Sequence, residues 1–194
     1  MFQWTTEQFD LPILDWIASR LHCRFLDKMM PFITQLGDSG IFWIALALIF
    51  LCFSKYRKMA ISMGIAMLLG LLLCNVTLKP LVARIRPYDY QLTHFGTTIR
   101  LLIAAPHDFS FPSGHTAASF EAATAMLLYN RKLGIPAIIL AGLIAFSRLY
   151  LYVHYPTDVL FSVCLGIGLA FLGRFLCEQG CRKILKSFTK GWSA

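Results

Sequence analysis

The feature that most constrains this chain is a series of long apolar segments separated by short basic or polar clusters. Residues 59–78 are long enough, as a helix, to cross a hydrocarbon core of roughly 30 Å. Further apolar segments at 41–54, 113–129, 133–152 and 156–176 give five predicted transmembrane spans, of which the first is short and is expected to borrow flanking residues. With 57% hydrophobic and 14% charged residues, the composition is that of a membrane protein. We predict an all-α, polytopic helix bundle that forms a single integral-membrane domain over residues 1–194.

Residues 1–36 differ from the rest of the chain. Leu11, Leu14 and Ile17 recur at helical spacing with polar residues on the other faces, which predicts an amphipathic helix in the membrane interface. A second apolar stretch at 25–33 contains Asp27 and Pro31, which argue against a free-standing span. We therefore predict an interfacial segment over 1–36 and a bundle with the active site over 37–194. Whether the N-terminal segment adds a sixth span stays open.

The basic residues predict the orientation. The net charge is +8, and its cations gather at the ends of apolar segments, chiefly Lys55, Arg57, Lys58, Arg131, Lys132 and the C-terminal tail. Cytoplasmic ends of spans are enriched in Lys and Arg, so these sites and the C-terminus are predicted to be cytoplasmic, in a multi-pass protein of the cell membrane. The remaining polar clusters then face the extracytoplasmic side. With no RNA- or DNA-binding motif, a nucleic-acid partner is not expected.

The first polar cluster supplies Lys79, Arg84 and Arg86. A guanidinium group binds phosphate through two parallel hydrogen bonds, and an ammonium group acts on phosphate as a compact charge. The cluster therefore favours a phosphate site. Taken alone, it is also compatible with a solvated or lipid-headgroup-binding basic loop.

The second cluster, Pro112, Ser113, Gly114 and His115, opens a predicted helix. A helix N-terminus presents unpaired backbone N–H groups and a positive dipole end to an anion. His115 is a candidate proton donor near neutral pH. An ordinary helix cap with an interfacial histidine is the alternative interpretation.

The third cluster carries Arg148, His154 and Asp158 around the end of one span and the start of the next. A carboxylate bonded to one imidazole nitrogen fixes the tautomer and leaves the other nitrogen free to attack, and histidine is an acceptable covalent nucleophile. The alternatives are a structural Arg–Asp pair and a capped helix with an uninvolved histidine.

The three clusters are separated by membrane spans but are predicted to share one face. Together they hold three cations, a helix N-terminus, a nucleophile with its orienting acid, and a second histidine, which are the parts needed for phosphoryl transfer. No carboxylate cluster that would hold Mg²⁺ is evident, so we predict no metal and no cofactor. We hypothesise that all three clusters converge on one phosphate.

The motif Lys79-x6-Arg86-Pro87, followed by Pro112-Ser113-Gly114-His115 and Ser147-Arg148-x5-His154-x3-Asp158, resembles the three-part signature of the type 2 phosphatidic acid phosphatase (PAP2) superfamily, in its membrane-embedded branch. The resemblance implies that His154 attacks phosphorus to form a phosphohistidine, that Asp158 orients it, and that His115 protonates the leaving oxygen. It implies that the phosphoryl oxygens are held by the remaining positions, Lys79, Arg86, Ser113, Gly114 and Arg148. Arg84 and Ser147 are placed at the rim.

The chain resembles bacterial undecaprenyl pyrophosphate phosphatases, and we predict a lipid phosphate substrate, with undecaprenyl pyrophosphate favoured. Phosphatidylglycerophosphate and phosphatidic acid are the rival substrates. A vanadium haloperoxidase and a non-catalytic lipid-phosphate binder or transporter are alternatives of other kinds. The sequence assigns no oligomeric state. Glu121 is expected either to pack against Asn75 or another helix or to contact substrate.

Overall fold

The computed structural model describes residues 3–190, and side chains within residues 3–181. That part of the chain is helical, with turns and loops and no strand, as predicted. The elements in chain order are α1 (Gln3–Thr5), η1 (Thr6–Asp10), α2 (Leu11–Arg20), α3 (Arg24–Gln35), η2 (Asp38–Gly40), α4 (Ile41–Leu51), η3 (Ser54–Tyr56), α5 (Arg57–Gly70), η4 (Leu71–Leu78), α6 (Lys79–Val82), α7 (Pro87–Phe95), α8 (Gly114–Tyr129), α9 (Arg131–Tyr150) and α10 (Pro156–Lys190).

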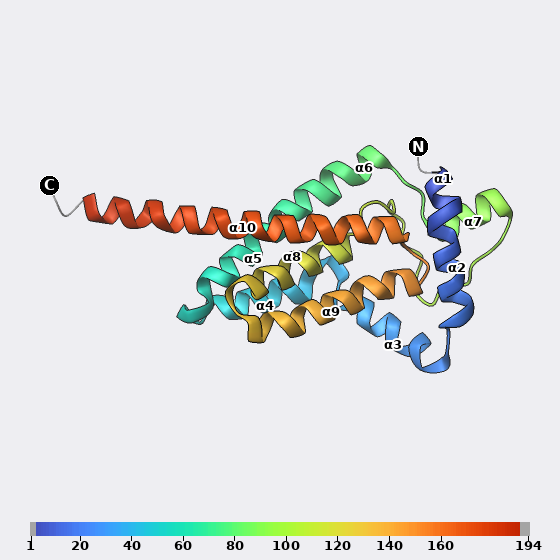
Figure 1. The fold of residues 1–194 in the computed structure, drawn as a ribbon, viewed down its shortest axis with the longest axis horizontal. Coiled ribbons are helices and arrows are strands. Elements are labelled where there is room, and N and C mark those ends of the chain that lie inside the picture. The colour runs from blue at the N-terminus through green and yellow to red at the C-terminus, as the bar shows by residue number, and fades with distance from the viewer. Residues whose placement is uncertain (1–2, 191–194) are drawn as a thin grey trace.

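Helix α8 occupies the centre of the bundle, where it packs against α5, α9 and α10. The short turn between α8 and α9 is fixed by Asn130, whose side-chain oxygen accepts hydrogen bonds from the backbone N–H groups of Lys132 and Leu133. This satisfies donors that a helix start leaves unpaired. The α4–α5 connection, the α8–α9 turn and the C-terminal end of α10 lie at one end of the bundle, opposite α1, α2 and α7 (Figure 1).

Two glycines allow the central helices to approach closely. A Cβ added to Gly134 of α9 would lie 2.2 Å from Cα of Leu127 in α8, and one added to Gly166 of α10 would lie 2.8 Å from the carbonyl oxygen of Ala117 in α8. Both neighbours are backbone atoms that cannot move independently of their helix. Small residues at such crossings are typical of membrane bundles, where close backbone packing drives helix association.

Within the described residues, three helical stretches are long and apolar enough to cross a membrane: Ser54–Phe95, Arg131–Tyr150 and Pro156–Cys181. Helix α3 and the η2–α4 unit, bent by 43° at their junction, satisfy the same test as a pair and give a fourth. The predicted spans at 59–78 and 156–176 fall within two of the long stretches, and the predicted span at 133–152 overlaps the third but runs two residues past its end. The total is three or four, so five separate spans are not found by this criterion.

The two missing spans have different physical reasons. The predicted span at 41–54 is too short alone, and it reaches membrane length only by joining α3, which the sequence had assigned to an interfacial segment ending at residue 36. The predicted span at 113–129 forms a helix of only 16 residues. Nine of these residues are buried in the protein, so α8 is shielded by its neighbours rather than by its own apolar surface.

The N-terminal helices are fastened to the rest of the chain by their acidic residues. Glu7 accepts a hydrogen bond from the Tyr90 hydroxyl, Asp15 from Tyr152 and Asp27 from Tyr150, at 2.6–2.7 Å. The apolar side of α2, with Leu11, Leu14 and Ile17, is buried, and α2 runs across the end of the bundle (Figure 1). The predicted amphipathic helix is present, and its apolar face packs on protein.

The close approach of α10 to α8 predicts a position-specific effect on stability. Gly166→Leu should lower the free energy of unfolding by about 1–3 kcal/mol, because overpacking forces backbone or side-chain shifts. Gly168→Leu, two residues along the same helix, is the control, because a Cβ there meets nothing within 4 Å. Thermal unfolding in detergent, followed by circular dichroism, measures both. Equal stability of the two variants would contradict the packing described here.

Candidate active site

A cavity of about 610 Å³ is lined by the end of α3, the start of α8, the end of α9 and the loop before α8. It collects six of the eight site residues that the sequence proposed, drawn from all three clusters: Lys79, Arg86, Gly114, His115, Arg148 and His154. The predicted convergence of the three clusters on one place is therefore observed. Ser113 and Asp158 lie behind this surface and do not line the cavity.

His154 follows α9 and is 1% exposed. Its Nδ1 lies 3.6 Å from Oδ2 of Asp158, too far for a good hydrogen bond, and 3.4 Å from Oγ of Ser110. The Ser110 hydroxyl donates to the same Asp158 oxygen at 2.5 Å. The Ser110 hydroxyl therefore lies between the imidazole of His154 and the carboxylate of Asp158. The other ring nitrogen, Nε2, faces the cations of the cavity.

Arg84 lies behind Asp158 and is buried, not at the rim as the sequence suggested. Its Nη1 donates to Oδ1 of Asp158 and its Nη2 to Oδ2 of Asp10, both at 2.6 Å. Its guanidinium carbon also lies 3.7 Å from the centre of the Tyr155 ring. Arg84 thus links the N-terminal segment to the first turn of α10 and holds the Asp158 carboxyl from the side away from His154.

Arg86 reaches the front of His154. Its Nη1 lies 3.3 Å from Nε2 of His154 and donates to the carbonyl of Val153 at 2.6 Å. Its Nη2 donates to Oδ1 of Asp108 at 2.5 Å, and Lys79 pairs with the other oxygen of that carboxylate. The Asp108 carboxylate therefore bridges two of the cations proposed to hold phosphate.

Arg148 is 3% exposed and donates from Nη1 to the hydroxyl of Thr34 in α3 at 2.6 Å. Two serines of the signature are turned away from the cavity. The Ser113 hydroxyl lies 2.9 Å from that of Thr116, and the Ser147 hydroxyl donates to the carbonyl of Ile144 in its own helix. Ser147 is therefore buried in the helix packing, not at the rim.

The charges around the cavity set the protonation of its loop residues. Burial lowers the pKa of His154 well below 6.5, and the positive charges of Arg86 and Arg148 lower it further. Burial alone would raise the pKa of the Asp108 carboxyl, but Lys79 and Arg86 outweigh that effect and hold it well below its ordinary value. At neutral pH, His154 is an uncharged imidazole facing cations, the form in which a ring nitrogen can act as a nucleophile.

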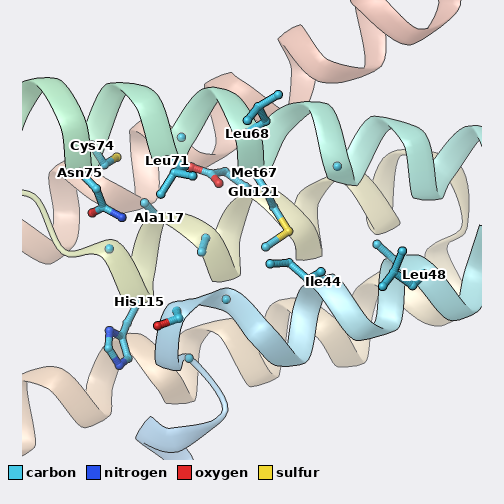
Figure 2. A pocket seen from close by; sticks show the side chains of 18 of the residues that line it. Ile44, Leu48, Met67, Leu68, Leu71, Cys74, Asn75, His115, Ala117 and Glu121 are labelled. Atoms are coloured by element: carbon cyan, nitrogen blue, oxygen red, sulfur yellow. The ribbon is translucent and has the colours of Figure 1, made fainter.

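An apolar groove of about 620 Å³ adjoins this cavity, and both are lined by Lys79, Asp108, Gly114 and His115. Figure 2 shows its walls, with Ile44 and Leu48 of α4 facing Met67 and Leu71 on the α5–η4 side. A cationic cavity thus opens directly onto a hydrocarbon-lined space.

Glu121 of α8 is 1% exposed and packs against Gly70, where an added Cβ would lie 1.9 Å from Oε1 of Glu121. Glu121 therefore packs against another helix, with α5 and not Asn75 as the partner. It also lines the apolar groove, so contact with substrate stays a prediction. Gly70 makes room for the carboxyl group at the crossing of the two helices.

The other aromatic and histidine candidates of the 87–111 connection line neither large cavity. His94 stacks on the Tyr90 ring at 3.9 Å, and the Tyr88 hydroxyl donates to the carbonyl of Pro106. His107 and Phe95 are exposed. We expected His94 and His107 to be loop histidines: His107 lies in a loop, whereas His94 lies in the last turn of α7.

Sequence reasoning missed five polar side chains that support the site: Asp10, Thr34, Asp38, Asp108 and Ser110. Three come from the first forty residues, which the signature does not cover. Asp108 and Ser110 stand just before the second cluster, and their nearness to Pro112 was the one available signal. Single polar residues outside a motif carry no spacing pattern, so only the fold reveals their partners.

The chain is similar to known proteins over most of its length. Undecaprenyl-diphosphatase of Sulfolobus acidocaldarius is 33% identical over 166 residues, covering 85% of this chain and 77% of its own. Undecaprenyl-diphosphatase BcrC of Bacillus subtilis is 35% identical, covering 78% and 75% of the two chains. The crystal structure of a transmembrane PAP2-type phosphatidylglycerolphosphate phosphatase from Bacillus subtilis superimposes with a TM-score of 0.70 at 26% identity, covering 90% of this chain and 87% of that one.

The sequence model of the PAP2 superfamily matches residues 56–177, which include the three clusters that meet in the cavity. More than half of the chain is matched, and two relatives above 30% identity align over most of their own lengths. The chain therefore belongs to the PAP2 superfamily.

Proposed function

We propose that this membrane phosphatase hydrolyses a lipid phosphate or pyrophosphate without a metal ion, through a phosphohistidine on His154, and that undecaprenyl pyrophosphate is its substrate. One observation carries the proposal: a cavity lined by cations and two histidines opens onto an apolar groove. A soluble phosphate ester has no hydrocarbon chain to place in the groove, whereas a lipid phosphate can place its phosphate in the cavity and its chain in the groove. The names of the two undecaprenyl-diphosphatases support the substrate.

The chemistry follows from the contacts. Nε2 of His154 attacks phosphorus while the bond from phosphorus to the leaving oxygen breaks, and His115 gives its proton to that oxygen. Water then attacks the phosphohistidine, His115 takes the water's proton, and His154 is released as a neutral ring. Lys79, Arg86 and Arg148, with the backbone at Ser113 and Gly114, neutralise the charge on the phosphoryl oxygens. The Asp108 carboxylate must leave Lys79 and Arg86 when phosphate binds.

The arrangement of the helix ends supports the topology we propose. The basic connections at 55–58 and 131–132 lie at the end of the bundle away from the cavity (Figure 1). With these ends in the cytoplasm, the cavity faces the outside of the cell membrane and the C-terminus lies inside. We propose that α8 also crosses the membrane, shielded by α5, α9 and α10, which gives five spans.

Phosphatidylglycerophosphate is the second candidate substrate, because the structure of a phosphatase for that lipid superimposes over 90% of this chain. A non-catalytic lipid-phosphate binder or transporter is the alternative of another class. Phosphate release from purified protein in detergent, with undecaprenyl pyrophosphate, phosphatidylglycerophosphate and phosphatidic acid compared at equal concentration, ranks the substrates. Binding of all three lipids without release from any would favour the binder.

His154→Ala is expected to abolish phosphate release, because no other group of the cavity replaces the attacking nitrogen. The thermal unfolding temperature should stay close to that of the parent protein. His107→Ala is the matched control, since that exposed histidine lines neither cavity, and its rate should be unchanged. Both assays are run in EDTA, and loss of the parent activity on chelation would contradict the metal-free mechanism.

The contacts of Asp158 predict a graded series. Asp158→Asn should lower kcat severely, and Ser110→Ala should lower it by about tenfold or more, since misplacement of a catalytic group is costly. Ser147→Ala removes another buried hydroxyl, bonded only within its own helix, and should leave kcat unchanged. If Ser110→Ala has the same kcat for phosphate release as Ser147→Ala, then Ser110 does not connect Nδ1 of His154 to Asp158 in the way proposed.

The lowered pKa of His154 predicts that this ring stays neutral below pH 6.5. Nitrogen-15 NMR of the histidine-labelled protein measures this, with the His154 signal assigned by its absence in His154→Ala. Because the unfolded chain binds the proton first, the free energy of unfolding should decline as pH falls from 6.5 toward the lowered pKa. A titration midpoint of His154 at or above pH 6.5 would refute the proposed electrostatics.

A further inference from the structure

The helical structure is interrupted between α3 and α4, at the edge of the cavity. The two helices are bent by 43°, and the break is completed by Ser39 and Gly40 at φ values of 52° and 66°. A positive φ is costly for a residue with a side chain such as Ser39. This backbone places Asp38 in the wall of the cavity, beside His115.

Asp38 and His115 are in direct contact. Oδ1 of Asp38 lies 2.6 Å from Nε2 of His115, a short distance typical of a charge-assisted hydrogen bond. The preceding residue has no room for a side chain beside the ring, since a Cβ added to Gly37 would lie 2.8 Å from Cδ2 of His115. The break is therefore fitted to the imidazole on two sides, and Nδ1 is left as the nitrogen for a ligand in the cavity.

The charges around His115 explain why a carboxylate is needed there. The other charged or titratable residues of the cavity are Lys79 of α6, Arg86 and Asp108 of the loops, Arg148 of α9 and His154. Three of these are cations, which disfavour a protonated imidazole. Asp108 is paired with Lys79 and Arg86. In the described structure, Asp38 is the carboxylate that directly contacts His115.

We propose that Asp38 is a positioning residue for the acid His115: its carboxylate opposes the burial and the cations that disfavour a protonated ring, and it directs Nδ1 at the leaving oxygen. The inference deepens the proposed function and depends on it. As the phosphorus–oxygen bond breaks, its electron pair stays on the leaving oxygen, which takes the proton from Nδ1. Asp38 keeps its hydrogen bond to Nε2–H and takes no proton.

This assignment extends the site beyond the family match, which begins at residue 56. The same N-terminal segment supplies Thr34, which accepts a hydrogen bond from Arg148. One short stretch therefore contacts both a cation that holds phosphate and the acid that protonates the leaving group. Asp38 contacts the nitrogen of His115 that faces away from the proposed leaving oxygen, whereas Asp158 is linked to Nδ1 of His154 through Ser110.

The test is the pH dependence of kcat for phosphate release from undecaprenyl pyrophosphate, or from whichever lipid the panel ranks first. Asp38→Asn keeps an oxygen near Nε2 but removes the charge, so His115 loses its proton more easily. We expect kcat at neutral pH to fall about tenfold or more, and the alkaline limb of the profile to move to lower pH. Asp38→Glu should restore both, and Asp89→Asn, which removes an acid outside the cavity, should match the parent protein.

A second substrate separates acid positioning from a structural role. 4-Nitrophenyl phosphate has a leaving group that departs without a proton, so Asp38→Asn should slow it much less than the lipid. An unmoved alkaline limb in Asp38→Asn, or a loss of rate that Asp38→Glu does not restore, overturns the proposal for Asp38. His115→Ala separates this result from a failure of the proposed function. If His115→Ala still hydrolyses the lipid at the full rate, His115 is not the acid and that part of the proposed function is wrong. If His115→Ala is inactive and Asp38→Asn has normal activity, only the inference about Asp38 is wrong.

Discussion

The buried guanidinium of Arg84, held between the carboxylates of Asp10 and Asp158, is the interaction on which the rest of the site depends. Removing an ion from water costs several kcal/mol, and removal of one partner from a buried pair is more damaging than replacement of both. Here the cost is offset by two hydrogen bonds of 2.6 Å and by the hydroxyls of Thr6 and Thr157. Because the three charged residues come from distant segments, this contact fixes the N-terminal helices, the cationic loop and the start of α10 together.

On the cavity side of His154 the charges are arranged differently. Lys79, Arg86 and Arg148 approach one another with Asp108 as their main counter-charge, and that residue is half exposed on a loop. Cations held together in this way favour a phosphate, which brings more negative charge than one carboxylate. Burial and the same positive charges lower the pKa of His154, so in the proposed mechanism the cations that bind phosphate also help to keep the nucleophile neutral.

Much of the fold was predictable from local pattern. Apolar length gave the spans at 59–78, 133–152 and 156–176, and periodicity gave the amphipathic helix α2. The errors arise where neighbours replace lipid as the surroundings of a helix. Helix α8 is short and carries Glu121 because protein surrounds it, and α4 becomes long enough for a bilayer only together with α3. Hydropathy measures contact with lipid, so it cannot count a helix that other helices shield.

The sequence by itself determined the candidates for the chemistry, because motif spacing and residue type single out Lys79, Arg86, His115, Arg148 and His154 near helix ends. It also determined that they share one end of the bundle, since helices of membrane length alternate in direction. Only the tertiary structure decided which other side chains hydrogen-bond to these residues and hold them in position. Arg84 was expected at the rim and is buried, and Asp38 and Ser110 had no assigned partner. Such pairs join residues 44–77 positions apart, and they depend on how helices cross and where the chain bends, which no local pattern of residues specifies.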